Sequence, residues 1–115
     1  MSDQQIIKTT VRHMVNFLVN GDYKSVERIS KGCRLTEQEI ADAVSDYGET
    51  FIMPPDAAFD NLDIIKQDSE NQRSWSVNVD LWTNESGKSD LTLELTLIDS
   101  GKQICDVEIN GIHAL

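Results

Sequence analysis

Five side chains in the second half of the sequence have the chemistry of a protein-binding surface. Four are carboxylates and one is an indole: Asp80, Trp82, Glu94, Asp106 and Glu108. Each alternates with apolar neighbours, which places all five on the polar side of predicted strands. A tryptophan among charged side chains is a typical composition for a binding patch, and carboxylates steer a basic partner toward it. The alternative interpretation is a solvated acidic face that only confers solubility.

The side chains that could act as acids, bases or nucleophiles lack the arrangement that catalysis needs. They are His13, Tyr23, Cys33, Tyr47 and His113. General acid–base chemistry requires a titratable group that faces a cavity, and the strand positions predicted to face inward hold no carboxylate. The two tyrosines are expected in the core, and Cys33 has no histidine placed to activate it. The sequence therefore predicts no catalytic residue.

Metal and cofactor sites are not expected either. The two cysteines and two histidines lie far apart in the sequence, and no Cys-x-x-Cys pair is present. The N-terminal residues do not resemble a secretion signal, and no apolar run approaches the roughly 18 residues of a membrane span. A cytoplasmic location is therefore expected, in which Cys33 and Cys105 are free thiols.

The charge is distributed unevenly along the chain. The 115 residues carry a net charge of -10. Residues 1–34 hold three acidic and six basic side chains, a net +3, whereas residues 35–115 hold seventeen acidic and four basic side chains, a net -13. Such a field influences partners and association rates rather than fold. It favours a basic protein partner and disfavours direct nucleic-acid binding, because phosphates would be repelled.

The elements that position these side chains begin with helices. Apolar residues from Ile7 to Leu18 recur at helical spacing, and Gly21 follows at a position suited to a helix end. Asp22 can then accept hydrogen bonds from the first turn of a short second helix.

A third helix is predicted by the strongest local signal in the chain. Thr36 and Glu39 have the spacing of a capping box, and the helix is expected to end near Tyr47. The pair Pro54-Pro55 then imposes an extended connection. Three helices are therefore expected within about residues 3–47.

Four predicted strands follow. Residues 61–67 form a short candidate, and segments 75–82, 91–98 and 105–110 alternate apolar and polar side chains with period two. Such alternation indicates strands with one buried face. Turn-forming sequences at 84–87 and 99–102 connect them as hairpins. The sheet is therefore expected to be antiparallel and to lie within about residues 61–111.

Helices followed by antiparallel strands predict an α+β fold. The expected order is α-α-α-β-β-β-β, with three N-terminal helices packed on one face of a curved four-stranded antiparallel sheet. At 115 residues the chain fits a single domain, with a helical part at 1–50 and a sheet part at 60–112.

The helix–helix junction at residues 16–23 (NFLVNGDY), together with this order, resembles the nuclear-transport-factor-2-like (cystatin-like) fold. Members often open with a helix, a Gly-Asp-aromatic sequence and a second helix, and end in a curved antiparallel sheet around a conical cavity. Residues 75–82 (WSVNVDLW), 89–95 (SDLTLEL) and 107–113 (VEINGIH) also resemble a family of small bacterial proteins without assigned function. These resemblances imply a fold and no particular activity.

The leading hypothesis is a non-enzymatic binding module. Small acidic proteins of this kind resemble the immunity partners of bacterial contact-dependent toxins, so the expected partner is a basic toxin domain, such as a nuclease. The four carboxylates would pair with its basic side chains, and Trp82 would fill an apolar pocket. Two alternatives are a small-molecule-binding or isomerase-like cone protein, and a homodimer whose sheet faces pack together. A polar cavity with a perturbed carboxylate would favour the former, and a symmetric interface over Trp82 the latter.

Overall fold

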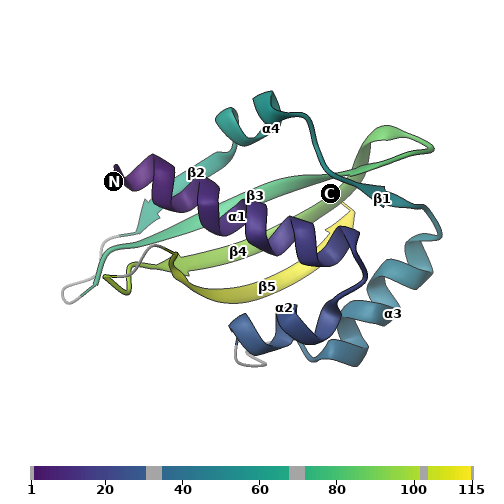
Figure 1. Ribbon diagram of the computed structural model, residues 1–115, viewed down its shortest axis with the longest axis horizontal. Coiled ribbons are helices and arrows are strands. Elements are labelled where there is room, and N and C mark those ends of the chain that lie inside the picture. The colour runs from purple at the N-terminus through teal and green to yellow at the C-terminus, as the bar shows by residue number, and fades with distance from the viewer. Residues whose placement is uncertain (1, 31–34, 68–71, 102–103, 115) are drawn as a thin grey trace.

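The computed structural model describes residues 2–30, 35–67, 72–101 and 104–114. Within them the helices are α1 (Asp3–Val19), α2 (Tyr23–Ser30), α3 (Glu37–Tyr47) and α4 (Asp56–Asp60). The strands are β1 (Phe51–Ile52), β2 (Asp63–Gln67), β3 (Ser74–Thr83), β4 (Gly87–Ile98) and β5 (Asp106–Ala114). They form one antiparallel sheet in the order β1-β3-β4-β5, with β2 also paired to β3 (Figure 1). The predicted α+β fold is therefore confirmed.

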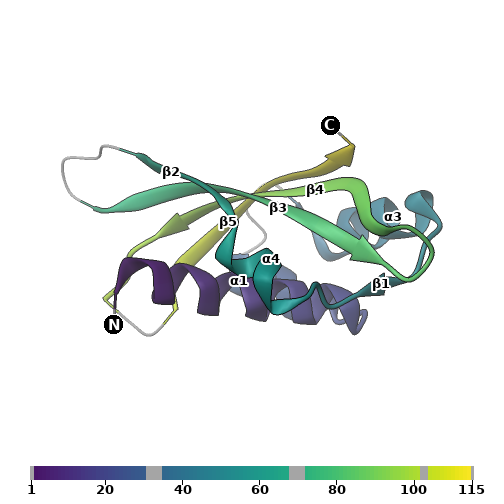
Figure 2. The same cartoon turned by 90° about the horizontal axis from the view of Figure 1, so that it is seen from above.

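The molecule has two layers. Figure 2 shows the helices on one side of the sheet, and the other side carries no helix in the described part of the chain. Helix α1 contributes a buried stripe to the interface between the layers: Ile7, Val11, Met14, Val15 and Leu18. The sheet contributes the apolar residues that alternation placed inward, all of them buried: Trp75, Val77, Val79, Leu81, Leu91, Leu93, Leu95, Leu97, Cys105, Val107 and Ile109. Hydrophobic burial between these two faces holds the layers together.

Capping side chains define where the helices begin. The Thr36 hydroxyl accepts a hydrogen bond from the Glu39 amide at 3.2 Å, and the Glu39 carboxylate accepts one from the Thr36 amide at 3.1 Å. Helix α3 then ends at Gly48, whose φ of 76° is readily adopted by glycine. The Asp22 carboxylate accepts from the Ser25 amide at 3.2 Å, as expected for the start of α2. The predicted caps of α2 and α3 are thus confirmed.

Two short elements were not predicted, and both lie between residues 51 and 60. Strand β1 pairs with the end of β3, with Ile52 opposite Trp82, so the sheet has five strands in the described chain rather than four. Helix α4 begins directly after Pro55, which is extended at φ -61° and ψ 154°. Elements of two and five residues are too short to produce a recognisable hydrophobic period. The candidate strand at 61–67 begins two residues later than predicted, at Asp63.

Two irregularities interrupt the register of β4 with its neighbours. One lies between Asp80 and Trp82 of β3, where β4 carries extra residues. There the Ser89 hydroxyl donates to the Leu81 carbonyl at 2.7 Å and accepts from the Leu91 amide at 3.1 Å. The second lies between Glu94 and Leu95, opposite β5. Extra residues of this kind bend a strand and increase its twist.

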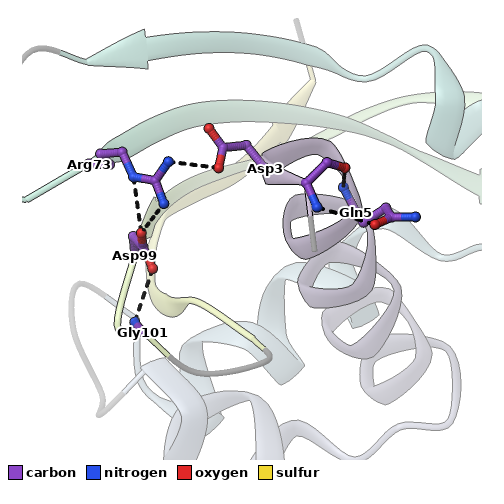
Figure 3. Close-up of polar contacts among 6 residues, drawn as sticks. Asp3, Gln5, Arg73, Asp99 and Gly101 are labelled. Atoms are coloured by element: carbon purple, nitrogen blue, oxygen red, sulfur yellow. Dashed lines mark hydrogen bonds and ion pairs between the residues drawn. The ribbon is translucent and has the colours of Figure 1, made fainter.

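An ion-pair cluster ties the start of α1 to the sheet (Figure 3). The Arg73 guanidinium donates to the Asp3 carboxylate at 2.9 Å and to the Asp99 carboxylate at 2.5 and 3.1 Å. Asp99 also accepts from the Gly101 amide at 3.0 Å. The cluster therefore joins Asp3 and Asp99, which are 96 residues apart in the sequence.

Candidate functional site

The strand register places all five predicted contact residues on the same face of the sheet, opposite the helices. Across β3 and β4, Asn78 lies opposite Glu94, Asp80 opposite Thr92 and Trp82 opposite Lys88. Across β4 and β5, Glu108 lies opposite Thr96 and Asp106 opposite Ile98. We call this side of β2 to β5 the outer face. The prediction that these side chains share a face away from the core is confirmed.

The structure separates the five residues along that face. Asp80 and Trp82 lie near the β1 end of β3, whereas Asp106 and Glu108 lie in the first half of β5, opposite the second half of β4. Glu94 lies between the two groups. Trp82 is half-buried rather than exposed, because it lines a pocket.

This pocket has a volume of about 370 Å³ and opens beside Trp82. We call it the edge pocket. It is lined by six apolar or aromatic residues and six polar ones: Pro54, Ala58, Phe59, Leu62, Val79 and Trp82, and Asn61, Asp63, Asn78, Asp80, Lys88 and Thr92. A volume of this size lies in the range of small ligand sites, which are usually largely apolar with few polar groups.

A break in the edge of the sheet creates the edge pocket. Strand β4 occupies one edge of β3, so β1 and β2 both pair with the other edge. The partner of β1 nearest to β2 is Trp82, and the partner of β2 nearest to β1 is Asn78. Residues 79–81 therefore have no strand beside them on that edge. The chain leaves the sheet here as residues 53–62, which include α4, and this excursion forms one wall.

Hydrogen bonds at the β3–β4 hairpin hold the beginning of that wall. The Glu85 carboxylate accepts from the Thr50 amide at 2.9 and 3.2 Å and from its hydroxyl at 3.1 Å, just before β1. The amide hydrogen bond holds the pKa of Glu85 below its ordinary value. The Glu49 carboxylate accepts from the hydroxyls of Thr83 and Ser86, each at 2.8 Å. These bonds fix the point from which the excursion departs.

Helix α1 holds α4, the helical part of the excursion at residues 53–62, in place. Lys8 pairs with Asp60 at 2.5 Å and Arg12 pairs with Asp56 at 3.2 Å, so both ends of α4 are attached to α1. The Lys8 hydrogen bond lowers the pKa of Asp60. The Arg12 guanidinium also lies 4.4 Å from the centre of the Phe59 ring, a cation–π contact. The edge pocket is thus built from preformed elements.

Asn61 donates to the Ala57 carbonyl at 2.8 Å, but the other polar side chains of the edge pocket are only weakly engaged. Lys88 Nζ lies 3.4 Å from Asp80 Oδ2, and both side chains are more than half exposed. Asn78 donates to Asp63 at 3.4 Å. Thr92 is 4% exposed, and its hydroxyl makes no hydrogen bond within the described part of the chain. Exposed ion pairs contribute little, so the carboxylates of Asp63 and Asp80 are available to a cationic ligand.

A second pair on the outer face was not anticipated. His113 Nε2 lies 2.9 Å from Glu94 Oε1. The His113 ring covers Gly111, where an added Cβ would lie only 2.6 Å from His113 Cε1. A glycine at position 111 therefore allows the ring to lie this close to the backbone. The Glu94 carboxylate in turn pairs with His113 of the same chain.

The residues considered for catalysis occupy structural or exposed positions. Tyr47 is half-buried against Phe51, with ring centres 6.1 Å apart, and its hydroxyl accepts from the Asp90 amide at 3.3 Å. Tyr23 packs against the core, and His13 is exposed beside Phe17. Cys33 lies outside the described residues. Within those residues, no group of three or more potential ligands could hold a metal ion.

The edge pocket is the part of the site that sequence reasoning missed. Its lining includes Phe59, Leu62 and Thr92, which no binding motif marks. The available signal was Pro54-Pro55, since prolines are confined to strand edges and interruptions. It indicated a break in regular structure, but not that the break would fall beside Trp82.

Comparisons with known proteins identify a family. Residues 15–115 match the model of a family described as a domain of unknown function, DUF7668. No curated protein and no solved structure matches the chain significantly. In the described residues, no helix is both long enough and apolar enough to cross a membrane. Because the match spans most of its length, the chain belongs to the DUF7668 family.

Proposed function

We propose that this chain is a non-enzymatic protein-binding module that docks a basic protein domain on its outer face. The observation that carries the proposal is a sheet face that no described helix covers, with carboxylates on four strands: Asp63, Asp80, Glu94, Asp106 and Glu108. Lys88 and His113 are the basic residues that the register places there in the described chain. Such a surface complements a basic partner, and charge complementarity favours rapid and selective encounter.

Within this class we propose an immunity protein that neutralises a basic bacterial toxin domain, for example a nuclease, in the cytoplasm. Support comes from the small size of the chain and its net charge of -10. A relationship to the nuclear-transport-factor-2-like fold is part of the same proposal, and the order of helices before an antiparallel sheet supports it. A nucleic acid is a poor partner for the outer face, because its phosphates would meet carboxylates.

Two alternatives remain distinguishable by measurement. A homodimer through the outer face would bring the same carboxylates of two copies together, and like charges in contact oppose association. Sedimentation of the isolated chain as a dimer at moderate salt would favour that alternative. A small-molecule-binding protein is favoured by the edge pocket, whose size suits a ligand.

The test uses the protein domain encoded by the reading frame next to that of this chain, with its active site inactivated. Association and dissociation rates are measured for the wild-type chain and for two variants. Trp82→Ala should mainly accelerate dissociation, because it removes an aromatic contact. Glu94→Lys with Glu108→Lys should slow association by about tenfold, because steering is lost.

A charge-matched control separates local contact from net charge. Asp42→Lys with Asp46→Lys makes the same change in net charge on α3, which lies on the helical side of the sheet. Both positions are exposed, so the fold should persist. The control should change the association rate far less than the outer-face pair does. Equal effects of the two pairs, or no binding to the neighbouring domain, would contradict the proposal.

A further inference from the structure

We infer that the edge pocket receives an arginine side chain from the basic partner. The inference rests on the proposed function and assigns a ligand chemistry to one part of the outer face. Four features carry it: a hydroxyl without a protein partner in the described chain, an open backbone edge, two weakly engaged carboxylates and an aromatic wall.

The hydroxyl of Thr92 has no hydrogen-bond partner in the described chain. Thr92 is 96% buried and lies directly opposite Asp80 in the register. Its hydroxyl makes no hydrogen bond within the described chain, although every fully enclosed side-chain polar atom there has a partner. The oxygen therefore keeps some exposure, and Thr92 lines the edge pocket. A hydroxyl that no protein group engages can accept a hydrogen bond from a ligand group that enters the pocket.

The backbone of Asp80 offers a further acceptor. The Leu81 carbonyl accepts from Ser89 on β4, so the polar backbone groups of Leu81 face β4. The Asn84 amide donates to the Thr50 carbonyl on the opposite side, which is the side of β1. Backbone groups alternate along a strand, so those of Asp80 face the same edge as those of Asn84. That edge is the break where residues 79–81 have no neighbouring strand.

These groups match the donors of a guanidinium ion. The carboxylates of Asp63 and Asp80, the Asp80 carbonyl and the Thr92 hydroxyl can all accept hydrogen bonds, while Trp82 provides an aromatic wall. Arginine has five donors in a planar group and stacks on aromatic rings. Lysine has a compact, strongly hydrated charge that is less suited to an aromatic wall. The edge pocket therefore favours arginine over lysine.

Lys88 competes with the incoming guanidinium. Its ammonium group lies 3.4 Å from Asp80, and the side chains of the two residues are 62% and 51% exposed. An exposed pair of this kind is weak and is readily exchanged for another cation. Removing Lys88 frees Asp80 and removes a repulsive charge, so it should strengthen binding.

The experiment uses an acetylated and amidated Gly-Arg-Gly peptide and its Gly-Lys-Gly counterpart, each titrated into the full chain and followed by amide and indole NMR signals. The arginine peptide should shift the Trp82 indole and the amides of Asp80 and Thr92. Lys88→Met should tighten its binding by about two- to fivefold, the scale of an exposed ion pair. Asp80→Asn should weaken it by about tenfold or more, because charge-assisted hydrogen bonds are lost. Lys66→Met is the matched control, since Lys66 lies on β2 opposite Trp75 of β3 and does not line the edge pocket.

A pair of substitutions at Thr92 tests the hydroxyl. Thr92→Ser keeps the oxygen and should retain binding, whereas the nearly isosteric Thr92→Val should weaken it. Shifts that do not cluster at the edge pocket, or equal binding of the lysine peptide, would overturn the inference. If the basic domain binds the outer face but none of these variants alters its affinity, the inference fails while the proposed function stands. If the arginine peptide fills the pocket but no basic domain docks, the protein-partner source is wrong and the pocket binds a free guanidinium compound.

Discussion

At the scale of single residues, hydrogen bonds between sequence neighbours define the helix starts. Ser2 and Gln5 cap α1 reciprocally at 3.2 and 3.3 Å, as Thr36 and Glu39 cap α3. Each pair satisfies backbone amides that the helix itself leaves unpaired. The Ser2–Gln5 box has the same sequence signature as the predicted one and was readable in advance.

Thr36→Ala should lower the free energy of unfolding by roughly 0.5–2 kcal/mol, because the hydroxyl that accepts from the Glu39 amide is lost. Urea denaturation measures the change. Ser45→Ala on the exposed side of α3 is the matched control and should stay within about 0.5 kcal/mol of wild type. Identical midpoints for Thr36→Ala and wild type would show that the box contributes nothing.

Cys105 should be unreactive in the folded protein. It is 3% exposed, and burial raises the pKa of its thiol, so little thiolate is present at neutral pH. In a Cys33→Ser background, a chromogenic disulfide reagent should react with Cys105 slowly in buffer and rapidly in denaturant. Rapid reaction without denaturant would contradict the observed burial.

At the scale of elements, side chains distant in sequence fasten α1 to the sheet and to α4. Arg73 bridges Asp3 of α1 and Asp99 after β4 (Figure 3). The Gly101 amide and the Arg73 guanidinium together hold the pKa of Asp99 below its ordinary value of 3.8. The pKa of Arg73 is raised by its hydrogen bond with Asp99. The Arg73–Asp99 pair therefore strengthens the cluster only while Asp99 is ionised, whereas Arg73 also pairs directly with Asp3 of α1.

This linkage predicts an acid-dependent loss of stability. Because the Asp99 pKa is lower in the folded state, the unfolded chain binds more protons as the pH falls below about 3.8, and folding then loses this contribution. Arg73→Gln should be less stable than wild type at neutral pH, and the difference should shrink as the pH falls through the folded pKa. Urea melts across this range measure it. Lys24→Gln removes one exposed charge elsewhere and should show no such convergence.

At the scale of the whole molecule, the outer face combines exposed charge with an absence of helical cover in the described chain. Five of the seventeen acidic residues of positions 35–115 lie on it: Asp63, Asp80, Glu94, Asp106 and Glu108. Their field extends about 8–10 Å into solution at physiological ionic strength. A basic partner would meet this field before it meets Trp82, so long-range charge and short-range contact act in sequence.

Association with the basic domain should therefore slow as salt is added. Between roughly 0.1 M and 1 M salt the screening distance falls from about 10 to about 3 Å, so the association rate should fall by about tenfold while dissociation changes less. The Glu94→Lys and Glu108→Lys pair should show a flatter dependence. A salt-independent association rate for wild type would mean that the outer face does not steer the partner.

The sequence by itself determined the features that depend on near neighbours. Period-two alternation assigned Trp75 and Val77 to the core and Asp80 to the opposite face, because successive strand side chains alternate regardless of partner. The Thr36 cap was equally predictable, because its bonds span three residues. These local rules were sufficient for the α+β order and for the composition of the outer face.

Only the tertiary structure decided where those faces are interrupted. Both β1 and β2 pair with the same edge of β3, and this long-range arrangement opens the break beside Trp82. The half-burial of Trp82, the unpartnered hydroxyl of Thr92 and the Glu94–His113 pair all follow from strand partners that are distant in sequence. Pairing between strands depends on the whole set of competing contacts, so a one-dimensional pattern determines a residue's face but not its neighbours across the sheet.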